Sequence, residues 1–188
     1  IPGEGGNTEK PEVELVGDGT LENPYNAAAA NAVAAALASG AESPNVYIKG
    51  KISSIKEEFG TEFGNATFYI SDDGTSNGEF YVFRTLYFGN KKYSDGENIK
   101  VGDEVVIYGK VTNYMGNTPE TVQNGSYLYS LNGKTADGGG EVGEAKGDGT
   151  LENPYNSVAA NNLAASLASD AESPNVYIKG KISSIKEE

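Results

Sequence analysis

The chain contains one segment twice. Residues 45–58 read NVYIKGKISSIKEE, and the same fourteen residues return at 175–188. The repeat is longer than this segment, because residues 17–58 and 147–188 align at a constant offset of 130 over 42 residues with six differences. Both copies must be able to form the same elements, so the repeat limits the fold before any local pattern is considered. We expect one complete domain followed by the opening third of another.

Composition divides the chain into four parts. Residues 1–16 are rich in Gly, Pro and Glu and predict a flexible tether, either a stalk or an ordinary terminus. Residues 17–133 form the domain. Residues 134–146, with three consecutive glycines and mixed charge, predict a linker, and residues 147–188 predict a truncated second repeat of one helix and one strand.

One helix is expected near the start of the domain. Asn23 is suited to the N-cap and Pro24 to the first helical position, and Gly40 favours a stop after Ser39. Apolar residues that recur every four positions predict a narrow stripe that covers an apolar surface. This stripe consists of Tyr25, Ala29, Val33 and Leu37.

Alternating apolar and polar residues predict five strands after the helix. Gly50 and Gly109 lie inside strands, where a glycine favours a bend or a close backbone approach. Short strands, bends and no room for crossover helices predict an all-β five-stranded Greek-key barrel with one capping helix. The register of the third strand stays open because both of its faces are apolar. The strands are expected at 45–58, 66–71, 79–88, 101–114 and within 118–131, most clearly at 126–131.

Composition argues against catalysis. The chain has no Cys, His or Trp, which removes thiolate chemistry, the commonest general base and the commonest metal ligands. The adjacent Asp72 and Asp73 lack the spacing of a calcium loop, and we expect them to form an Asx-turn. We therefore expect no enzyme activity, no cofactor and no metal site.

Charge argues against a polyanionic partner. The net charge is −13, and residues 17–133 carry eight Lys or Arg against fourteen Asp or Glu. Affinity for nucleic acid comes largely from neutralised phosphates, so this balance makes nucleic acid the less favoured ligand, although a local basic patch could still bind one.

Several motifs resemble OB-fold domains, in the variant found in secreted proteins and lipoproteins of Bacteroidetes. They are GDGTLENPY before the helix, then YIKGKI, FYISDD and VGDEVVIYGKV. The resemblance covers residues 17–133 and implies an extracellular or cell-surface location, with membrane contact only through a removed N-terminal anchor. It also implies a ligand face on the second and third strands, although exposed tyrosines can equally serve cross-strand pairing. The candidate ligand-binding residues are Tyr47, Lys49, Tyr69, Tyr81, Phe83 and Arg84.

Three functions remain open. The first is a non-enzymatic surface binding module for a glycan, protein or peptide. The second is a structural assembly protein built by strand complementation. The third is an oligonucleotide-binding domain.

The unpaired copy suggests self-association. Its strand would lie exposed along an edge, which favours pairing with another chain. We expect a dimer or a longer chain formed by strand exchange. The candidate self-association residues are Val176, Tyr177, Ile178, Gly180 and Ile182.

Overall fold

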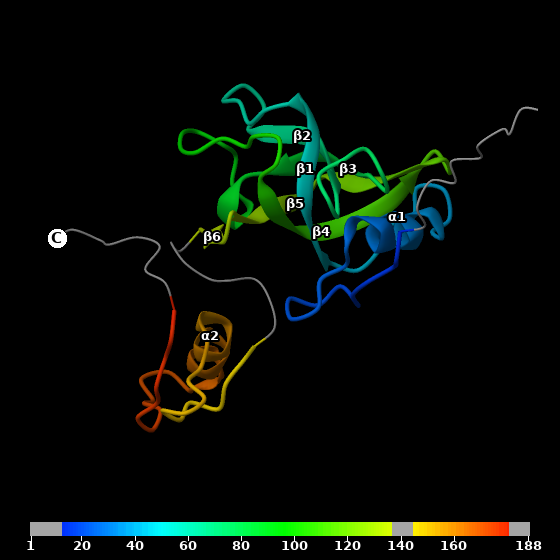
Figure 1. Cartoon of the computed structure of the whole chain (residues 1–188). Coiled ribbons are helices and arrows are strands. Elements are labelled where there is room, and N and C mark those ends of the chain that lie inside the picture. Colours follow the sequence, from blue (N-terminus) through cyan, green and yellow to red (C-terminus); the bar gives the residue numbers. More distant parts are fainter. Residues whose placement is uncertain (1–12, 137–144, 181–188) are drawn as a thin grey trace, which may run out of the picture.

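The computed structural model describes residues 13–136 and 145–180, and its main body is a closed barrel (Figure 1). The strand order is β3-β2-β1-β4-β5-β6, and a parallel pairing of β3 with β5 closes the barrel. The predicted all-β barrel with a capping helix is confirmed. The elements are α1 (Ala27–Ala35), β1 (Val46–Glu57), β2 (Asn65–Ser71), β3 (Phe80–Leu86), the 3-10 turn η1 (Phe88–Asn90), β4 (Glu104–Tyr114), β5 (Thr118–Leu131), β6 (Lys134–Thr135) and α2 (Ser157–Ser166).

Strand β1 belongs to both sides of the barrel, because its first half pairs with β4 and its second half with β2. Ile48 and Ile52 point into the core, as the alternation predicts. Gly50 lies just before the change of partner. A Cβ atom there would be 3.1 Å from both the Ile70 Cβ and the Ser71 carbonyl oxygen, so the close approach expected at Gly50 is confirmed.

Strand β5 is longer than predicted. It runs from Thr118, not from about Ser126, because pairing with β4 resumes beyond an irregularity opposite Gly109. Gly109 has a φ of 153°, and a Cβ atom there would overlap the Ser126 Cα and the Gly125 carbonyl oxygen. The glycine therefore lets the two strands approach closely where the barrel bends.

A bulge in β3 resolves the register that the sequence leaves open. Phe80 and Val82 are buried, whereas Tyr81 and Phe83 are only partly buried on the outer side. Arg84 has a φ of 44°, and this left-handed residue turns the fully buried Thr85 back into the barrel.

The predicted helix boundaries are wrong. The N-cap is Asn26 instead of Asn23, and the helix ends at Ala35 instead of Ser39. Tyr25 precedes the helix because its backbone is bound to β1: its N–H donates to the Tyr47 carbonyl (2.9 Å) and its carbonyl accepts from the Lys49 N–H (2.8 Å).

The buried face of α1 also differs from the predicted stripe. Tyr25, Val33 and Leu37 are only partly buried against the core. Alanines form the buried face, because short side chains let the helix lie close to the barrel. These are Ala27, Ala29, Ala30 and Ala34.

The core lies between α1 and the inner faces of the strands. Its largest members are apolar side chains that alternate along the strands, together with Ile99 from the segment before β4. These include Phe68, Phe80, Ile48, Ile52, Ile70, Ile107, Leu128 and Leu131. No helix in the described part of the chain is long and apolar enough to cross a membrane.

The second copy repeats the local structure of the first outside the barrel (Figure 1). Helix α2 begins after Asn156, whose side chain accepts from the Ala159 N–H as Asn26 accepts from Ala29. Tyr155 forms a parallel bridge with Ile178, as Tyr25 does with Ile48. Of the predicted self-association residues, Val176 is half-buried, and Tyr177, Ile178 and Gly180 are exposed; Ile182 lies outside the described residues.

Candidate ligand-binding surface

Strands β2 and β3 carry a patch of aromatic and cationic side chains on the outside of the barrel. The rings of Tyr69 and Tyr81 stack with centroids 4.7 Å apart at 23°, and the Phe83 ring lies 5.7 Å from that of Tyr81. Two cations, Lys56 and Arg84, border these rings. We call these five residues the aromatic surface.

Antiparallel pairing explains why the rings meet. Tyr69 lies directly opposite Tyr81, and Phe83 follows on the same side of β3. Phe83 is fixed by Thr121, whose Oγ1 accepts from the Phe83 N–H (2.8 Å) and donates to its carbonyl (3.0 Å). The Arg84 N–H donates to the Thr67 Oγ1 at 3.2 Å, which supports the backbone at the bulge.

Each cation lies over a ring. The Lys56 Nζ is 5.1 Å from the centre of Tyr69 and 4.9 Å from that of Tyr81. The Arg84 Cζ is 5.1 Å from the centre of Phe83. A side-chain hydrogen bond with Tyr69, followed by the charge of Tyr81, raises the pKa of Lys56, which therefore stays protonated near neutral pH.

Lys56 was not among the residues expected from sequence. It lies on β1 beyond an irregularity between Ile52 and Ser54, which shifts the alternation of the strand. The strand predicted at 45–58 includes Lys56, but the bulge that shifts its alternation cannot be seen in the sequence alone.

A buried carboxylate lies next to the rings. Glu120 is directly opposite Tyr81 in the parallel pairing of β5 with β3, and it is only 5% exposed. Its burial raises the pKa of the carboxyl group. A negative charge here acts against a polyanion on the aromatic surface, and Lys56 and Arg84 act in its favour.

Tyr47 and Lys49, also predicted as ligand-binding residues, lie in a different part of the barrel. Tyr69 is opposite Ser54, seven residues along β1 from Tyr47, which corresponds to roughly 23 Å of strand. Lys49 instead forms an ion pair with Glu104 at 3.2 Å. The structure thus brings four of the six predicted residues together and separates the other two.

Tyr47 belongs to a second tyrosine cluster on β1, β4 and β5. Its ring centre lies 4.3 Å from that of Tyr108 and 5.2 Å from that of Tyr129, and Tyr127 contacts Tyr108 at 5.6 Å. Burial, with a contribution from the neighbouring tyrosines, raises the pKa of Tyr47 to about 12. These rings contact one another across neighbouring strands, so the cluster fits the structural role of cross-strand pairing.

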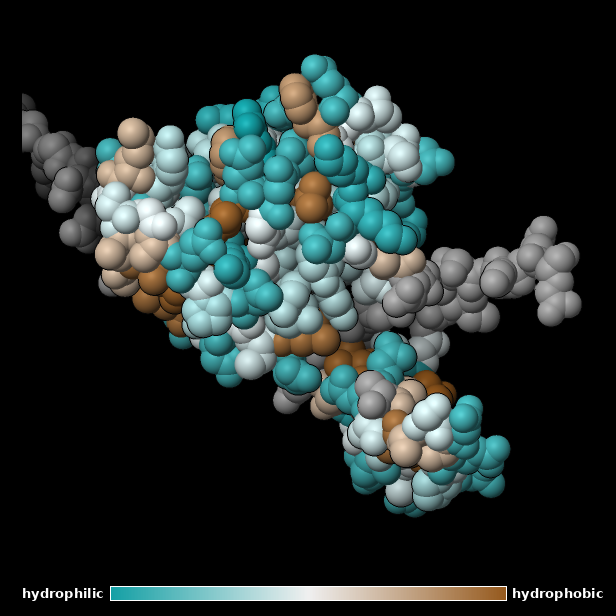
Figure 2. Space-filling model, turned by 180° about the vertical axis from the view of Figure 1, so that it is seen from behind, coloured by the Kyte–Doolittle hydropathy of each residue, from teal (hydrophilic) through white to brown (hydrophobic). Residues whose placement is uncertain are grey.

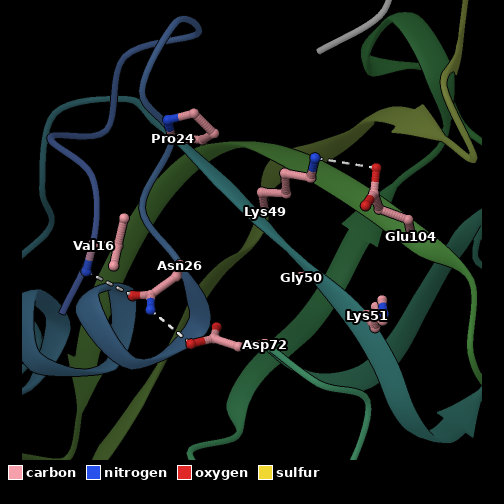
Figure 3. Close-up of a pocket in the computed structure, with 8 residues that line it drawn as sticks. All are labelled: Val16, Pro24, Asn26, Lys49, Gly50, Lys51, Asp72 and Glu104. Atoms are coloured by element: carbon pink, nitrogen blue, oxygen red, sulfur yellow. Dashed lines mark hydrogen bonds and ion pairs between the residues drawn. The ribbon is translucent and has the colours of Figure 1, made fainter. Parts of the chain in front are cut away.

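A pocket of about 230 Å³ lies where the first helix and strand meet the rest of the barrel (Figure 3). Asn26 lies at its edge and donates to the Asp72 carboxylate at 2.7 Å.

The neighbouring Asp73 accepts from the backbone and hydroxyl of Thr75, which is the predicted Asx-turn. The described residues contain no group of three or more metal-ligating side chains. The pocket is lined by Val16, Pro24, Asn26, Lys49, Gly50, Lys51, Asp72 and Glu104.

Comparison with known families agrees with this architecture. The family model tRNA_anti-codon, described as an OB-fold nucleic acid binding domain, matches residues 46–127, from the start of β1 into β5. The barrel is an OB-fold. In this fold the β2–β3 face and the adjoining loops bind oligonucleotides and oligosaccharides, and the aromatic surface lies on that face. A search of the curated proteins finds no match. The narrower resemblance to domains of Bacteroidetes stays a prediction.

Proposed function

We propose that this OB-fold binds a short single-stranded oligonucleotide on the aromatic surface. The observation that carries the proposal is the Tyr69–Tyr81–Phe83 row, flanked by Lys56 and Arg84, on the β2–β3 face. Every base has a flat π-face, so aromatic rings bind single strands with little preference for sequence. The family description also favours an oligonucleotide over the glycan, protein or peptide first expected.

Because the chain is acidic, the oligonucleotide would be bound mainly by stacking and less by phosphate contacts. Only two cations lie on the aromatic surface, so few phosphates are neutralised and stacking supplies most of the affinity. Two phosphate contacts to a single strand give a slope of about −1.4 for the logarithm of affinity against the logarithm of salt concentration. A shallow slope separates this mode of binding from that of a basic groove.

A neutral glycan is the second candidate. The net charge of −13 favours it, because an uncharged sugar is not repelled by the barrel. Sugars also stack on tyrosine rings. Both ligands would use the same surface, so the experiment must compare them directly.

Fluorescence anisotropy with labelled octathymidylate tests the proposal. We expect saturable binding by the wild type and a loss of about 5- to 150-fold for Tyr81→Ala, which corresponds to one stacked base. Tyr114→Ala is the matched control, since Tyr114 is 53% exposed at the end of β4. Equal losses for both variants, or no binding of octathymidylate together with binding on a neutral glycan array, would contradict the proposal.

A further inference from the structure

The two copies of the repeat form the same module. We call residues 17–49 the first module and residues 147–179 the second module. The Tyr47 N–H donates to the Gly19 carbonyl at 2.8 Å, and the Tyr177 N–H donates to the Gly149 carbonyl at 2.9 Å. The Asp18 and Asp148 side chains each accept from the hydroxyl two residues later at 2.7 Å. The local fold therefore forms in both modules alike, whether or not a barrel covers it.

The modules differ in what surrounds them. Ile48 is 1% exposed because it lies between the barrel and α1, whereas its counterpart Ile178 is 62% exposed. The helices differ in the same sense: Ala34 of α1 is fully buried, and its counterpart Ala164 is exposed. Figure 2 shows the second module as a lobe beside the barrel, with hydrophobic atoms on its surface. At Ile178 and Ala164 the face that the first module buries is thus uncovered in the second, whereas Val158 and Ala159 stay buried.

The polar groups that hold the first module in place have counterparts in the second. Figure 3 shows Asn26 bonded to Asp72 and Lys49 paired with Glu104, and Asp72 also accepts from the Ala27 N–H at 3.0 Å. Asp72 and Glu104 belong to the remainder of the barrel. The counterparts in the second module are Asn156, Ser157 and Lys179. The second module therefore carries the same groups that pair with Asp72 and Glu104 in the first.

The connection to the second module is long enough for that module to reach the place that the first module occupies in the barrel. Ala136 lies against Gly89, three residues beyond Leu86. From Leu86, pairing leads across Tyr127 and Tyr108 to Tyr47, which is bonded to Gly19. Four strand spacings, counting the one from Tyr47 to Gly19, and three residues make roughly 30 Å. The thirteen peptide links from Ala136 to Gly149, the counterpart of Gly19, can span about 43–47 Å.

We infer that the second module exchanges with the first for the same seat in the barrel of its own chain. The seat is the edge of β4 from Glu104 to Gly109, which β1 covers, together with Asp72. Sequence identity continues to residue 188, so the second copy has the counterpart of every residue of β1. Ser157 stands where Ala27 is fully buried, and burial of its hydroxyl group makes the second module the minor occupant.

The exchange takes place within one chain and not with a second copy, because of the number of seats and modules in each chain. Each chain has one seat and two modules, so exchange between chains fills no more seats than exchange within a chain. Association between chains also loses translational and rotational freedom, and a tethered module has a high effective concentration. This replaces the dimer or longer chain first expected from the repeat.

Disulfide trapping tests the exchange directly, because the chain has no cysteine of its own. Tyr47 lies opposite Tyr108 in β4, and its backbone groups bond to Gly19 and Tyr25. The pair is therefore of the non-hydrogen-bonded kind, with Cα atoms about 4.5 Å apart, which suits a disulfide. If the second module takes the seat, a Tyr177→Cys/Tyr108→Cys chain forms an intramolecular disulfide in glutathione buffer.

Two control pairs calibrate the trap. Tyr47→Cys/Tyr108→Cys reports the major arrangement and should cross-link in most molecules. Leu151→Cys/Tyr108→Cys places a thiol on the same module at an exposed residue away from its strand. We expect the Tyr177 pair to exceed the Leu151 pair at least fivefold. Equal yields for these two pairs would overturn the inference.

A core substitution shifts the balance and supplies an independent measurement. Ile48→Asp removes the first module from the seat, and we expect most Tyr177→Cys/Tyr108→Cys molecules to cross-link in that background. Ile48→Asp alone should keep a cooperative melt as a monomer, Ile178→Asp should melt like the wild type, and the double variant should lose the transition. Loss of the transition in Ile48→Asp alone, or recovery of a dimer by light scattering, would overturn exchange within the chain.

Discussion

The ammonium group of Lys56 lies 4.9 Å from the centre of the Tyr81 ring, so one side chain places a positive charge at the row of stacked rings. The same ammonium group lies 5.1 Å from the centre of the Tyr69 ring, so Lys56 contacts both members of the stacked pair. A phosphate next to a base stacked on this row would meet it.

Lys56→Gln should therefore weaken the binding of octathymidylate and flatten its salt dependence. We expect the slope to fall from about −1.4 to about −0.7, since one of two phosphate contacts is lost. Affinity measured by anisotropy at several salt concentrations gives the slope. Lys100→Gln, an exposed lysine in the turn before β4, is the control and should leave the slope unchanged. A slope that falls equally in both variants would remove Lys56 from the binding site.

Glu120 should make the barrel less stable as pH rises. Burial raises the pKa of its carboxyl group above the unfolded value, so its protonated form is favoured by folding. The stabilisation is fully present below the unfolded pKa and is lost as pH rises through the folded pKa. Glu120→Gln, which stays neutral, should raise stability at pH 7 by on the order of 1 kcal/mol.

Thermal melts between pH 4 and pH 7.5 measure this effect. The difference between Glu120→Gln and the wild type should be smallest at the acid end and grow with pH. Glu79→Gln is the control substitution, made at a half-buried carboxylate that accepts from the Ser53 hydroxyl. A constant difference across the range would mean that Glu120 does not titrate differently on folding.

Gly109 should tolerate no side chain. A Cβ atom would overlap β5, and a φ of 153° is unfavourable for other residues. We expect Gly109→Ala to lower the free energy of unfolding by about 2–3 kcal/mol in urea denaturation. Gly60→Ala is the matched control, since nothing lies within 4 Å of a Cβ there, and it should change stability by less than about 0.5 kcal/mol. Similar midpoints for the two variants would contradict the close approach.

Much of the barrel could be predicted from alternation. Ile48, Ile52, Phe68 and Ile70 are buried as the pattern indicates, because a strand with one face on a core repeats every two residues. The helix start could not be predicted from propensity. Pro24 is a good first helical residue in isolation, but backbone bonds between Tyr25 and β1 hold this segment extended. Such bonds join residues more than twenty positions apart, and local patterns do not contain them.

Only part of the candidate site could be predicted, because local patterns do not contain long-range pairing. Tyr69 and Tyr81 could be paired from their places on neighbouring strands. The bulges at Ile52–Ser54 and Arg84 decide that Lys56 and Phe83 join them, and bulges leave no fixed mark in a sequence. The sequence predicts Tyr47 on the same face because the change of partner along β1, from β4 to β2, cannot be seen in local alternation.

Aromatic ring NMR during titration with octathymidylate tests the central claim most directly. Ring resonances of Tyr69, Tyr81 and Phe83 should shift together and saturate, because bases that stack on them change the local ring currents. The ring resonances of Tyr47 and Tyr108, on the other part of the barrel, should not shift. Shifts confined to the Tyr47 cluster, or no shift at saturating oligonucleotide, would contradict binding on the aromatic surface.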